Sequence, residues 1–224
     1  MISENQIISE TMQYFIRRFD SNPEKTCAFP GRVNLIGEHL DYNRGISISC
    51  GINKWISVSA SKRADDKIVV RSENLKSEFV FTIDFKNTIQ ELWHKYIFGA
   101  LNVFASQHRL NKGLNIIING NLPMGSGLSS SAALEGALLS CCFSLFDIEI
   151  DKLRLAKLCQ RIEHEYLSIN SGLLDQLSSI YAKDNNYTLI NFSNSSHCYI
   201  KNNIENVSLL LVNSMIKREL ANSK

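Results

Sequence analysis

Residues 123–142, PMGSGLSSSAALEGALLSCC, set two glycines and three consecutive serines against the start of an apolar helical pattern. The first backbone N–H groups of a helix have no intrahelical partner, and the helix dipole is positive there, so this junction can hold an anion. Gly125 and Gly127 allow the backbone to curl closely and to adopt positive φ. The serines at 129–131 add hydroxyl groups that can cap the helix, bond phosphate oxygens or reach a cation. The stretch therefore predicts a polyphosphate site.

Three familiar glycine motifs do not fit this stretch. The P-loop pattern needs a lysine after Gly127, and none follows. A dinucleotide-binding loop would need a third glycine at Ser130, and the nucleophile elbow of hydrolases would need one at Ser131. The alternative to phosphate binding is a well-capped core helix that follows a flexible turn.

A second group of polar residues lies in FPGRVNLIGEHLDYNRGIS, residues 29–47. The turn DYNRG after the apolar run VNLI is expected to bring Glu38, His39 and Asp41 to one end of a strand. Carboxylates accept paired hydrogen bonds from neighbouring sugar hydroxyls, and Arg32 offers a fixed fork of donors. This composition suits a sugar, whereas the alternative is a salt-bridged surface turn.

A third group lies in CQRIEHEYLSINSGLLDQLSS, residues 159–179. Glu163 stands at the edge of an apolar helical face, and Asp175 follows two leucines. An acidic side chain among apolar neighbours is costly unless it meets a cation or a donor, so Asp175 is a candidate general base or charge partner. The alternative is an acid that caps the backbone of its own helix.

Hydrophobic periodicity predicts the elements that position these residues. Helices are expected over residues 3–20, 88–108, 130–146, 151–168 and 172–182, the first with Ser3 and Gln6 in a capping arrangement. Short β-prone runs are TCAF, VNLI, ISISCGI, WISVSAS, KIVVRS, EFVFTID, LNIIING, NYTLINF, HCYIK and VSLLLVNS. Together they predict a mixed or antiparallel sheet with helices packed against it.

The composition is that of an ordinary globular protein. The chain has 224 residues, 44% of them hydrophobic and 21% charged, and a formal net charge of +2, which does not suit a nucleic-acid binder. No stretch approaches the length of about 18 apolar residues that a membrane span needs. The six cysteines form no C-x-x-C pair and are interpreted as reduced core thiols. We expect a cytoplasmic protein without nucleic-acid or membrane partners; its oligomeric state is open, with a monomer expected.

Taken together, the three groups resemble the galactokinase branch of the GHMP small-molecule kinases. GRVNLIGEHLDYN is similar to the sugar-binding signature of that family, PMGSGLSSSAA to its phosphate loop, and EHEYLSINSGLLDQ to its third region. The resemblance implies an α+β fold, that of the GHMP-kinase N-terminal domain, which is shared with ribosomal-protein-like domains. It also implies transfer of the γ-phosphoryl group of ATP to the anomeric hydroxyl of galactose, with Mg²⁺.

The resemblance also assigns roles to residues. It implies that Asp175 accepts or orients the sugar proton while Arg32 keeps Asp175 ionised and neutralises phosphoryl charge. It implies that Ser131 and Glu163 are ligands of Mg²⁺. The implied sugar contacts are Glu38, His39, Leu40, Asp41 and Gly172, and the implied ATP contacts are Gly125, Ser126, Gly127, Leu128, Ser129, Ser130, Ser131 and Ser72.

The chain also departs from the family pattern. Leu40 stands where threonine is usual and Arg44 where glycine or asparagine is common, so a kinase for N-acetylgalactosamine or another sugar is an alternative. A non-catalytic sensor of galactose and ATP is a second alternative. Because galactokinases carry a second, ferredoxin-like domain, we expect that domain to be missing. Residues 1–224 would then form the N-terminal domain, with about 206–224 the start of a truncated C-terminal region, and the chain a fragment or an inactive truncated product.

Overall fold

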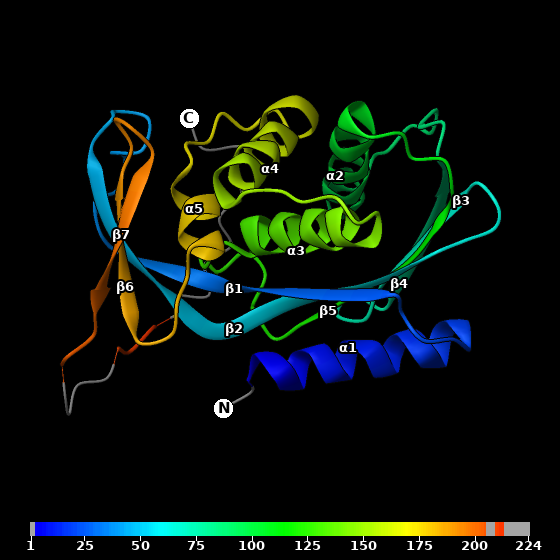
Figure 1. Cartoon of the computed structure of the whole chain (residues 1–224), viewed down its shortest axis with the longest axis horizontal. Coiled ribbons are helices and arrows are strands. Elements are labelled where there is room, and N and C mark those ends of the chain that lie inside the picture. Colours follow the sequence, from blue (N-terminus) through cyan, green and yellow to red (C-terminus); the bar gives the residue numbers. More distant parts are fainter. Residues whose placement is uncertain (1–2, 205–208, 213–224) are drawn as a thin grey trace.

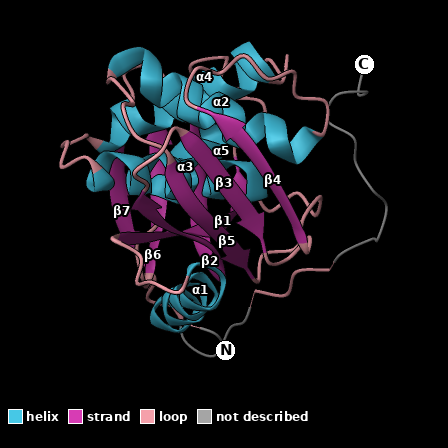
Figure 2. Ribbon diagram, turned by 90° about the vertical axis from the view of Figure 1, so that its right-hand side faces the viewer, coloured by secondary structure: helices cyan, strands magenta, loops and turns pink. Residues whose placement is uncertain are grey.

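The computed structural model describes residues 3–204 and 209–212, which form one sheet with helices on both faces. Helix α1 (Glu4–Phe19) covers one face alone, as Figures 1 and 2 show. Ser3 caps α1, because its Oγ accepts a hydrogen bond from the backbone N–H of Gln6 at 3.2 Å. The predicted cap is therefore confirmed.

Four helices lie together on the opposite face, in the order shown in Figure 1. They are α2 (Leu92–Gln107), α3 (Ser130–Leu145), α4 (Lys152–Tyr166) and α5 (Leu174–Ile180). Helix α3 is central and carries eleven buried residues, which is expected of a helix that is apolar nearly all round. Helix α2 begins four residues later than predicted, since residues 88–91 are not helical.

The sheet has seven strands. Its order is β4 (Ser77–Thr82), β3 (Lys67–Ser72), β5 (Leu114–Gly120), β2 (Ile46–Lys62), β6 (Asn186–Asn191) and β7 (Ser196–Lys201), with β1 (Lys25–Ile36) also paired to β2. Among the pairs in the described ranges, β3 with β5 is parallel and the others are antiparallel. This confirms the expected mixed sheet and the α+β fold.

Two strands are longer than the sequence pattern suggests. TCAF and VNLI belong to the single strand β1, which passes through Pro30 and Gly31 with a register shift between Pro30 and Arg32. ISISCGI and WISVSAS likewise belong to one strand, β2, whose two ends pair with β6 and β5. A bulge re-aims side chains along a strand, and Arg32 follows the bulge in β1.

Two further expectations need correction or fall partly outside the described residues. Cys141, Cys142 and Cys159 are buried free thiols as expected, but Cys198 is exposed on β7 and is no core residue. In the run VSLLLVNS, residues 209–212 are exposed and not in a strand, and its other residues, like most of the segment from about 206 to 224, lie outside the described residues. None of the described helices combines the length and apolar character needed to cross a membrane.

Candidate active site

The glycine loop before α3 has the backbone geometry of an anion site. Gly125 and Gly127 have φ of 68° and 73°, which favours glycine over other residues. A Cβ at either position would meet nothing within 4 Å, so space is open beside the loop. Ser129 precedes the helix in the left-handed region, with φ of 58°. The hydroxyl of Ser129 is buried, has no hydrogen-bond partner within the described ranges and does not cap the helix.

The rest of the loop is tied to its surroundings. Ser126 Oγ donates to the carbonyl of Pro123 at 2.7 Å, which closes the turn. The carbonyl of Leu128 accepts a hydrogen bond from the backbone N–H of Arg32 at 3.1 Å. Ser130 starts α3. The loop is therefore held against β1 while the N–H groups at the start of α3 lack intrahelical partners.

Arg32 connects this loop to Asp175. Its Nη2 and Nε lie 2.5 and 3.1 Å from Oδ1 of Asp175, and its Nη1 donates to the carbonyl of Gly127 at 2.7 Å. The side chain of Arg32 is 12% exposed and that of Asp175 is 39% exposed. The carboxylate of Asp175 is therefore partly exposed and paired with a guanidinium, whereas the sequence suggested an acid enclosed by apolar neighbours. It does not cap α5, which has no side-chain cap.

Asp41 meets the segment before α5 from the other side. Its Oδ2 accepts a hydrogen bond from the backbone N–H of Leu174 at 3.3 Å. A Cβ on Gly172 would lie 1.7 Å from the same oxygen, so a residue without a side chain is required while Asp41 keeps this position. The turn after β1 and the start of α5 are thereby joined across 131 or more residues of sequence.

The other residues of the turn after β1 are exposed. Glu38, His39 and Leu40 lie on the surface, and His39 Nδ1 makes a short contact with the hydroxyl of Tyr42. Among the described residues, no polar contact joins Glu38 or His39 to Asp175. The structure thus brings Arg32, Asp41 and Asp175 together and leaves the rest at the rim.

Glu163 meets two hydroxyl groups behind the loop. Ser131 Oγ donates to Oε1 of Glu163 at 3.3 Å, and Ser171 Oγ donates to Oε2 at short range. Glu163 is 5% exposed, and burial raises the pKa of its carboxyl group above the usual value. A nearly buried carboxyl group with no cationic partner among the described residues is suited to gain a cation.

The donor set fits Mg²⁺ bound together with a nucleotide. Ser131 and Glu163 supply oxygen atoms, and Mg²⁺ is commonly held by one or two carboxylates, substrate phosphates and waters. Within residues 3–204 and 209–212, no three His, Cys, Asp or Glu side chains gather as a metal site. A cation here would therefore depend on phosphate oxygens as well as on the protein.

A cavity lies next to the glycine loop. This cavity of about 370 Å³ is lined by Ser72, Asn74, Leu75, Trp93, Leu122, Pro123, Met124 and Leu134, with Ile56, Ile118, Gly120 and Asn121. Its walls are mainly apolar with a few polar groups, which is typical of a pocket for a small molecule. Ser72 lies at the cavity, but its buried hydroxyl accepts a hydrogen bond from Leu75 N–H at 3.3 Å.

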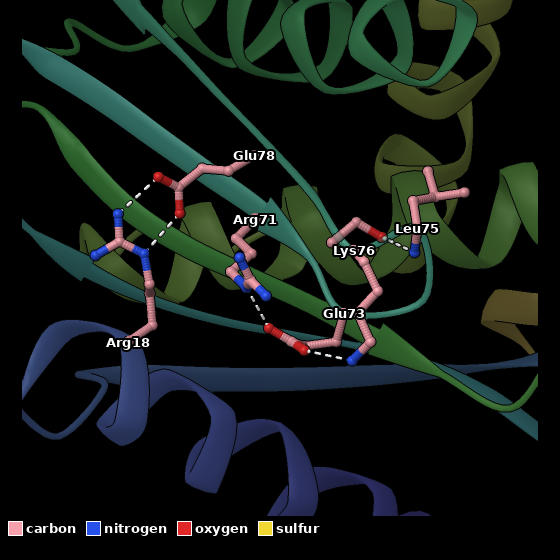
Figure 3. Close-up of polar contacts among 7 residues, drawn as sticks. Arg18, Arg71, Glu73, Leu75, Lys76 and Glu78 are labelled. Atoms are coloured by element: carbon pink, nitrogen blue, oxygen red, sulfur yellow. Dashed lines mark hydrogen bonds and ion pairs between the residues drawn. The ribbon is translucent and has the colours of Figure 1, made fainter.

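Ion pairs fix the turn that forms one wall of this cavity. Figure 3 shows Glu73 between Arg71 and Lys76, whose nitrogens lie 2.5 and 2.9 Å from its carboxylate. Asn74 Nδ2 donates to the carbonyl of Gly120 at 2.6 Å. On the same edge, Arg18 of α1 binds Glu78 of β4 through two hydrogen bonds of 2.6 Å. The β3–β4 turn is therefore held firmly against β5.

Sequence reasoning missed several residues at this site. Trp93 and Leu134 line the cavity, and Glu135 and Gln176 are buried behind Glu163 without hydrogen-bond partners in the described part of the chain. The signal for Glu135 was its charge in an otherwise apolar helix. Trp93 gave no local signal, because its place depends on how α2 packs against the sheet.

Two protein-family models match the chain. The model of the GHMP kinases N terminal domain matches residues 95–183, which include the glycine loop and Asp175. The model of the galactokinase galactose-binding signature matches residues 13–62, which include Arg32 and Asp41.

Curated galactokinases are similar over nearly the whole chain. The galactokinase of Clostridium perfringens (strain 13 / Type A) is 34% identical over 216 residues, and that of Ligilactobacillus salivarius is 35% identical over 214 residues. In both cases the match covers 94% of this chain and 55% of the relative. The chain thus spans about half the length of the curated relatives it matches.

Solved structures agree with these similarities. The crystal structure of Lactococcus lactis galactokinase complexed with galactose matches with a TM-score of 0.78 and 30% identity, over 87% of this chain and 52% of that one. The Methanococcus jannaschii mevalonate kinase matches with a TM-score of 0.68 and 19% identity, over 79% of this chain and 56% of that one, and this likeness concerns the fold alone. The chain thus carries a GHMP kinase N-terminal domain over residues 95–183 and a galactokinase galactose-binding signature over residues 13–62.

Proposed function

We propose that this chain forms the sugar- and ATP-binding part of an enzyme that transfers the γ-phosphoryl group of ATP to the anomeric hydroxyl of galactose. The observation that carries the proposal is the position of Arg32, whose guanidinium contacts both Asp175 and the carbonyl of Gly127. A candidate base and a candidate phosphate loop are thereby held on either side of one cation. We also propose that the enzyme acts in the cytoplasm, which the reduced cysteines support.

The glycine loop and the neighbouring cavity would together hold ATP. Gly125–Ser131 would hold the triphosphate through backbone N–H groups and hydroxyls. The cavity that includes Ser72 and Trp93 would hold the adenine base. This arrangement would direct the γ-phosphate toward Arg32 and Asp175, because Arg32 contacts the carbonyl of Gly127 in the loop. Alignment and charge neutralisation are the main requirements of this reaction.

The sugar would lie between the turn after β1 and the start of α5. Asp41 would accept hydrogen bonds from sugar hydroxyls, and the backbone at Gly172 allows close approach because it has no side chain. The exposed Glu38, His39 and Leu40 would complete the rim of the sugar site. Asp175 would accept the proton of the anomeric hydroxyl, or orient that hydroxyl, as the oxygen attacks the γ-phosphorus.

Ser131 and Glu163 would hold Mg²⁺ together with the nucleotide. Their mutual contact of 3.3 Å supports this assignment, because it places two oxygen donors side by side. When bound, the ion neutralises charge on the β- and γ-phosphates. The hydrogen bond from Ser171 keeps the Glu163 carboxylate oriented toward Ser131. Arg32 adds a fixed positive charge on the opposite side, next to the phosphate loop.

Titration calorimetry and ³¹P nuclear magnetic resonance test this proposal. We expect galactose and ADP each to bind the chain, and a sugar 1-phosphate signal to appear when ATP, Mg²⁺ and galactose are combined with the active enzyme. Galactose, N-acetylgalactosamine and glucose compared at equal concentration would identify the preferred sugar. Absence of binding by both galactose and ADP would overturn the proposal.

A further inference from the structure

Glu73, in the turn between β3 and β4, is a buried acid that none of the roles above uses. It is 8% exposed, and its carboxylate lies between two cations, as Figure 3 shows. Arg71 Nε is 2.5 Å from one carboxylate oxygen, and Lys76 Nζ is 2.9 Å from the other. Burial alone would raise the pKa of the Glu73 carboxyl group, but the two cations outweigh it and hold that pKa below its usual value. The acid is therefore kept charged inside the turn.

The chain neighbours of Glu73 form a wall of the cavity next to the glycine loop. Ser72, Asn74 and Leu75 line that cavity. The backbone N–H of Glu73 donates to the carbonyl of Ile118 at 2.9 Å, and Ile118 of β5 lines the same cavity. Glu73 itself thus occupies the centre of the segment that forms the wall. Any change in the position of its backbone would move lining residues on both sides of it.

Lys76 occupies a backbone position that favours glycine. Its φ is 52°, in the left-handed region that is costly for a residue with a Cβ. The side chain of Lys76 makes two contacts from this position. Its Nζ binds Glu73, three residues earlier, and lies 5.7 Å from the centre of the Tyr14 ring on α1, within the range of a cation–π attraction. The backbone does not explain a lysine here, whereas the contacts of its ammonium group do.

Helix α1 supports the same hairpin at a second point. Arg18 of α1 binds Glu78 of β4, and Glu78 lies directly opposite Arg71 in the pairing of β3 with β4. The charges therefore alternate in sign from α1 across both strands to Glu73. Glu73 is the member of this row that lies in the turn itself, so it joins the support from α1 to the cavity wall.

We propose that Glu73 is a positioning residue for the nucleotide site: by binding Arg71 and Lys76 together, it fixes the β3–β4 turn as a wall of the cavity for the adenine base. The inference rests on the proposed function, from which it takes the occupant of the cavity. Removing one partner of a buried ion pair leaves the remaining charges uncompensated, so the turn would leave its position in part of the molecules. Nucleotide affinity then falls in proportion to the fraction that still has the turn in place.

The test uses the full chain and titration calorimetry with two probes, ADP with Mg²⁺ and galactose. Glu73→Gln keeps the size of the side chain and removes its charge. We expect the Kd for ADP to rise about tenfold, which corresponds to a turn that stays in place in about one tenth of the molecules. We expect the Kd for galactose to stay the same, because the proposed sugar contacts lie on other elements.

Glu78→Gln is the matched control on the same hairpin. It removes an ion pair of the same kind, with Arg18, but Glu78 lies in β4 and not in the segment 72–75 that lines the cavity. We expect this variant to bind ADP with normal affinity. An equal loss of ADP affinity in Glu73→Gln and Glu78→Gln would identify a general role in hairpin stability and overturn the inference. A loss of galactose affinity as large as that of ADP affinity in Glu73→Gln would overturn it as well.

Lys76→Asn tests the same link if Glu73→Gln does not fold. Asparagine tolerates a positive φ, so this variant keeps the turn geometry and removes the ammonium group. We expect its ADP affinity to fall while its galactose affinity stays the same, and unchanged ADP affinity would contradict the inference.

Failure of the inference and failure of the proposed function give different results. Normal ADP binding by both the original chain and Glu73→Gln would overturn the inference and leave the proposed function intact. If the original chain binds galactose but no ADP, the cavity is not a nucleotide site and the inference is wrong. If the original chain binds neither, the proposed function fails and the inference with it.

Discussion

Arg32 and Asp175 are 143 residues apart in the sequence, and the guanidinium of the first contacts the carboxylate of the second at 2.5 Å. The same guanidinium donates to Gly127 in the glycine loop at 2.7 Å. Arg32 therefore holds in one place two features that the sequence presents as independent motifs. Its planar fork of donors permits this, whereas a lysine would offer a single point charge.

Replacement of Asp175 tests its proposed part in proton transfer. We expect Asp175→Ala to lower kcat by about 100-fold or more, the range typical of removing a general base, with KM for the sugar and for ATP changed much less. The measurement is steady-state kinetics of the active enzyme with galactose and ATP. Unchanged turnover would show that Asp175 does not take part in the reaction.

Gly172→Ala tests the sugar side of the site. The added Cβ would lie 1.7 Å from Oδ2 of Asp41, so the carboxylate must rotate away from Leu174 N–H. We expect galactose affinity to fall at least about tenfold, because a misplaced carboxylate leaves sugar hydroxyls without their acceptor. Fold stability should change little, because only the end of one side chain has to move.

The control for that variant is Gly136→Ala inside α3. A Cβ there would meet Phe29 at an ordinary distance of 3.4 Å, and alanine is favoured over glycine in a helix by about 1 kcal/mol. We expect a higher melting temperature and normal galactose binding. Equal effects of the two substitutions on galactose binding would contradict the specific contact of Gly172 with Asp41.

Burial raises the pKa of Glu135, which makes fold stability depend on pH. Above the usual pKa of 4.5, the unfolded chain releases this proton while the folded chain keeps it, so stability falls as pH rises toward the folded pKa. Glu135→Leu removes this loss. We expect its melting temperature relative to the original chain to be higher at about pH 8 than at about pH 5. An equal difference at both pH values would show that Glu135 is not protonated in the fold.

Trp93 provides a direct report on the proposed adenine cavity. The chain has two tryptophans, and Trp93 lines the cavity next to the glycine loop whereas Trp55 does not. In Trp55→Phe, where Trp93 is the remaining tryptophan, we expect ADP to change the emission of the protein. In Trp93→Phe the response to ADP should be much smaller, and an equal response in both variants would place the base elsewhere.

Much of the fold follows from local sequence patterns. The helices at α1, α3 and α4 begin within one or two residues of their predicted starts, because apolar spacing and capping residues mark them. The pattern did not reveal that β1 passes unbroken through Pro30 and Gly31, since these residues usually interrupt a strand. Their neighbours decide the outcome: Ser179 of α5 donates to the carbonyl of Pro30 at 2.7 Å.

The sequence motifs predicted which residues belong to the site, but they predicted the contacts among those residues less well. The positive φ of Gly125 and Gly127 was expected from residue type alone. The sequence also suggested that Asp175 was surrounded by apolar residues, but its side chain is 39% exposed and pairs with Arg32. Neighbours along a chain are poor guides to burial when a short helix starts at the edge of the core.

By itself, then, the sequence determined the helices, most strands and the chemistry of the glycine loop, because these depend on periodicity, capping and backbone freedom over a few residues. Only the tertiary structure decided that Arg32 contacts Asp175, that Asp41 occupies the space beside Gly172, and that Glu135 and Gln176 are buried. Such contacts join elements far apart in the chain. They are set by how four helices pack on one face of the sheet, which no local pattern specifies.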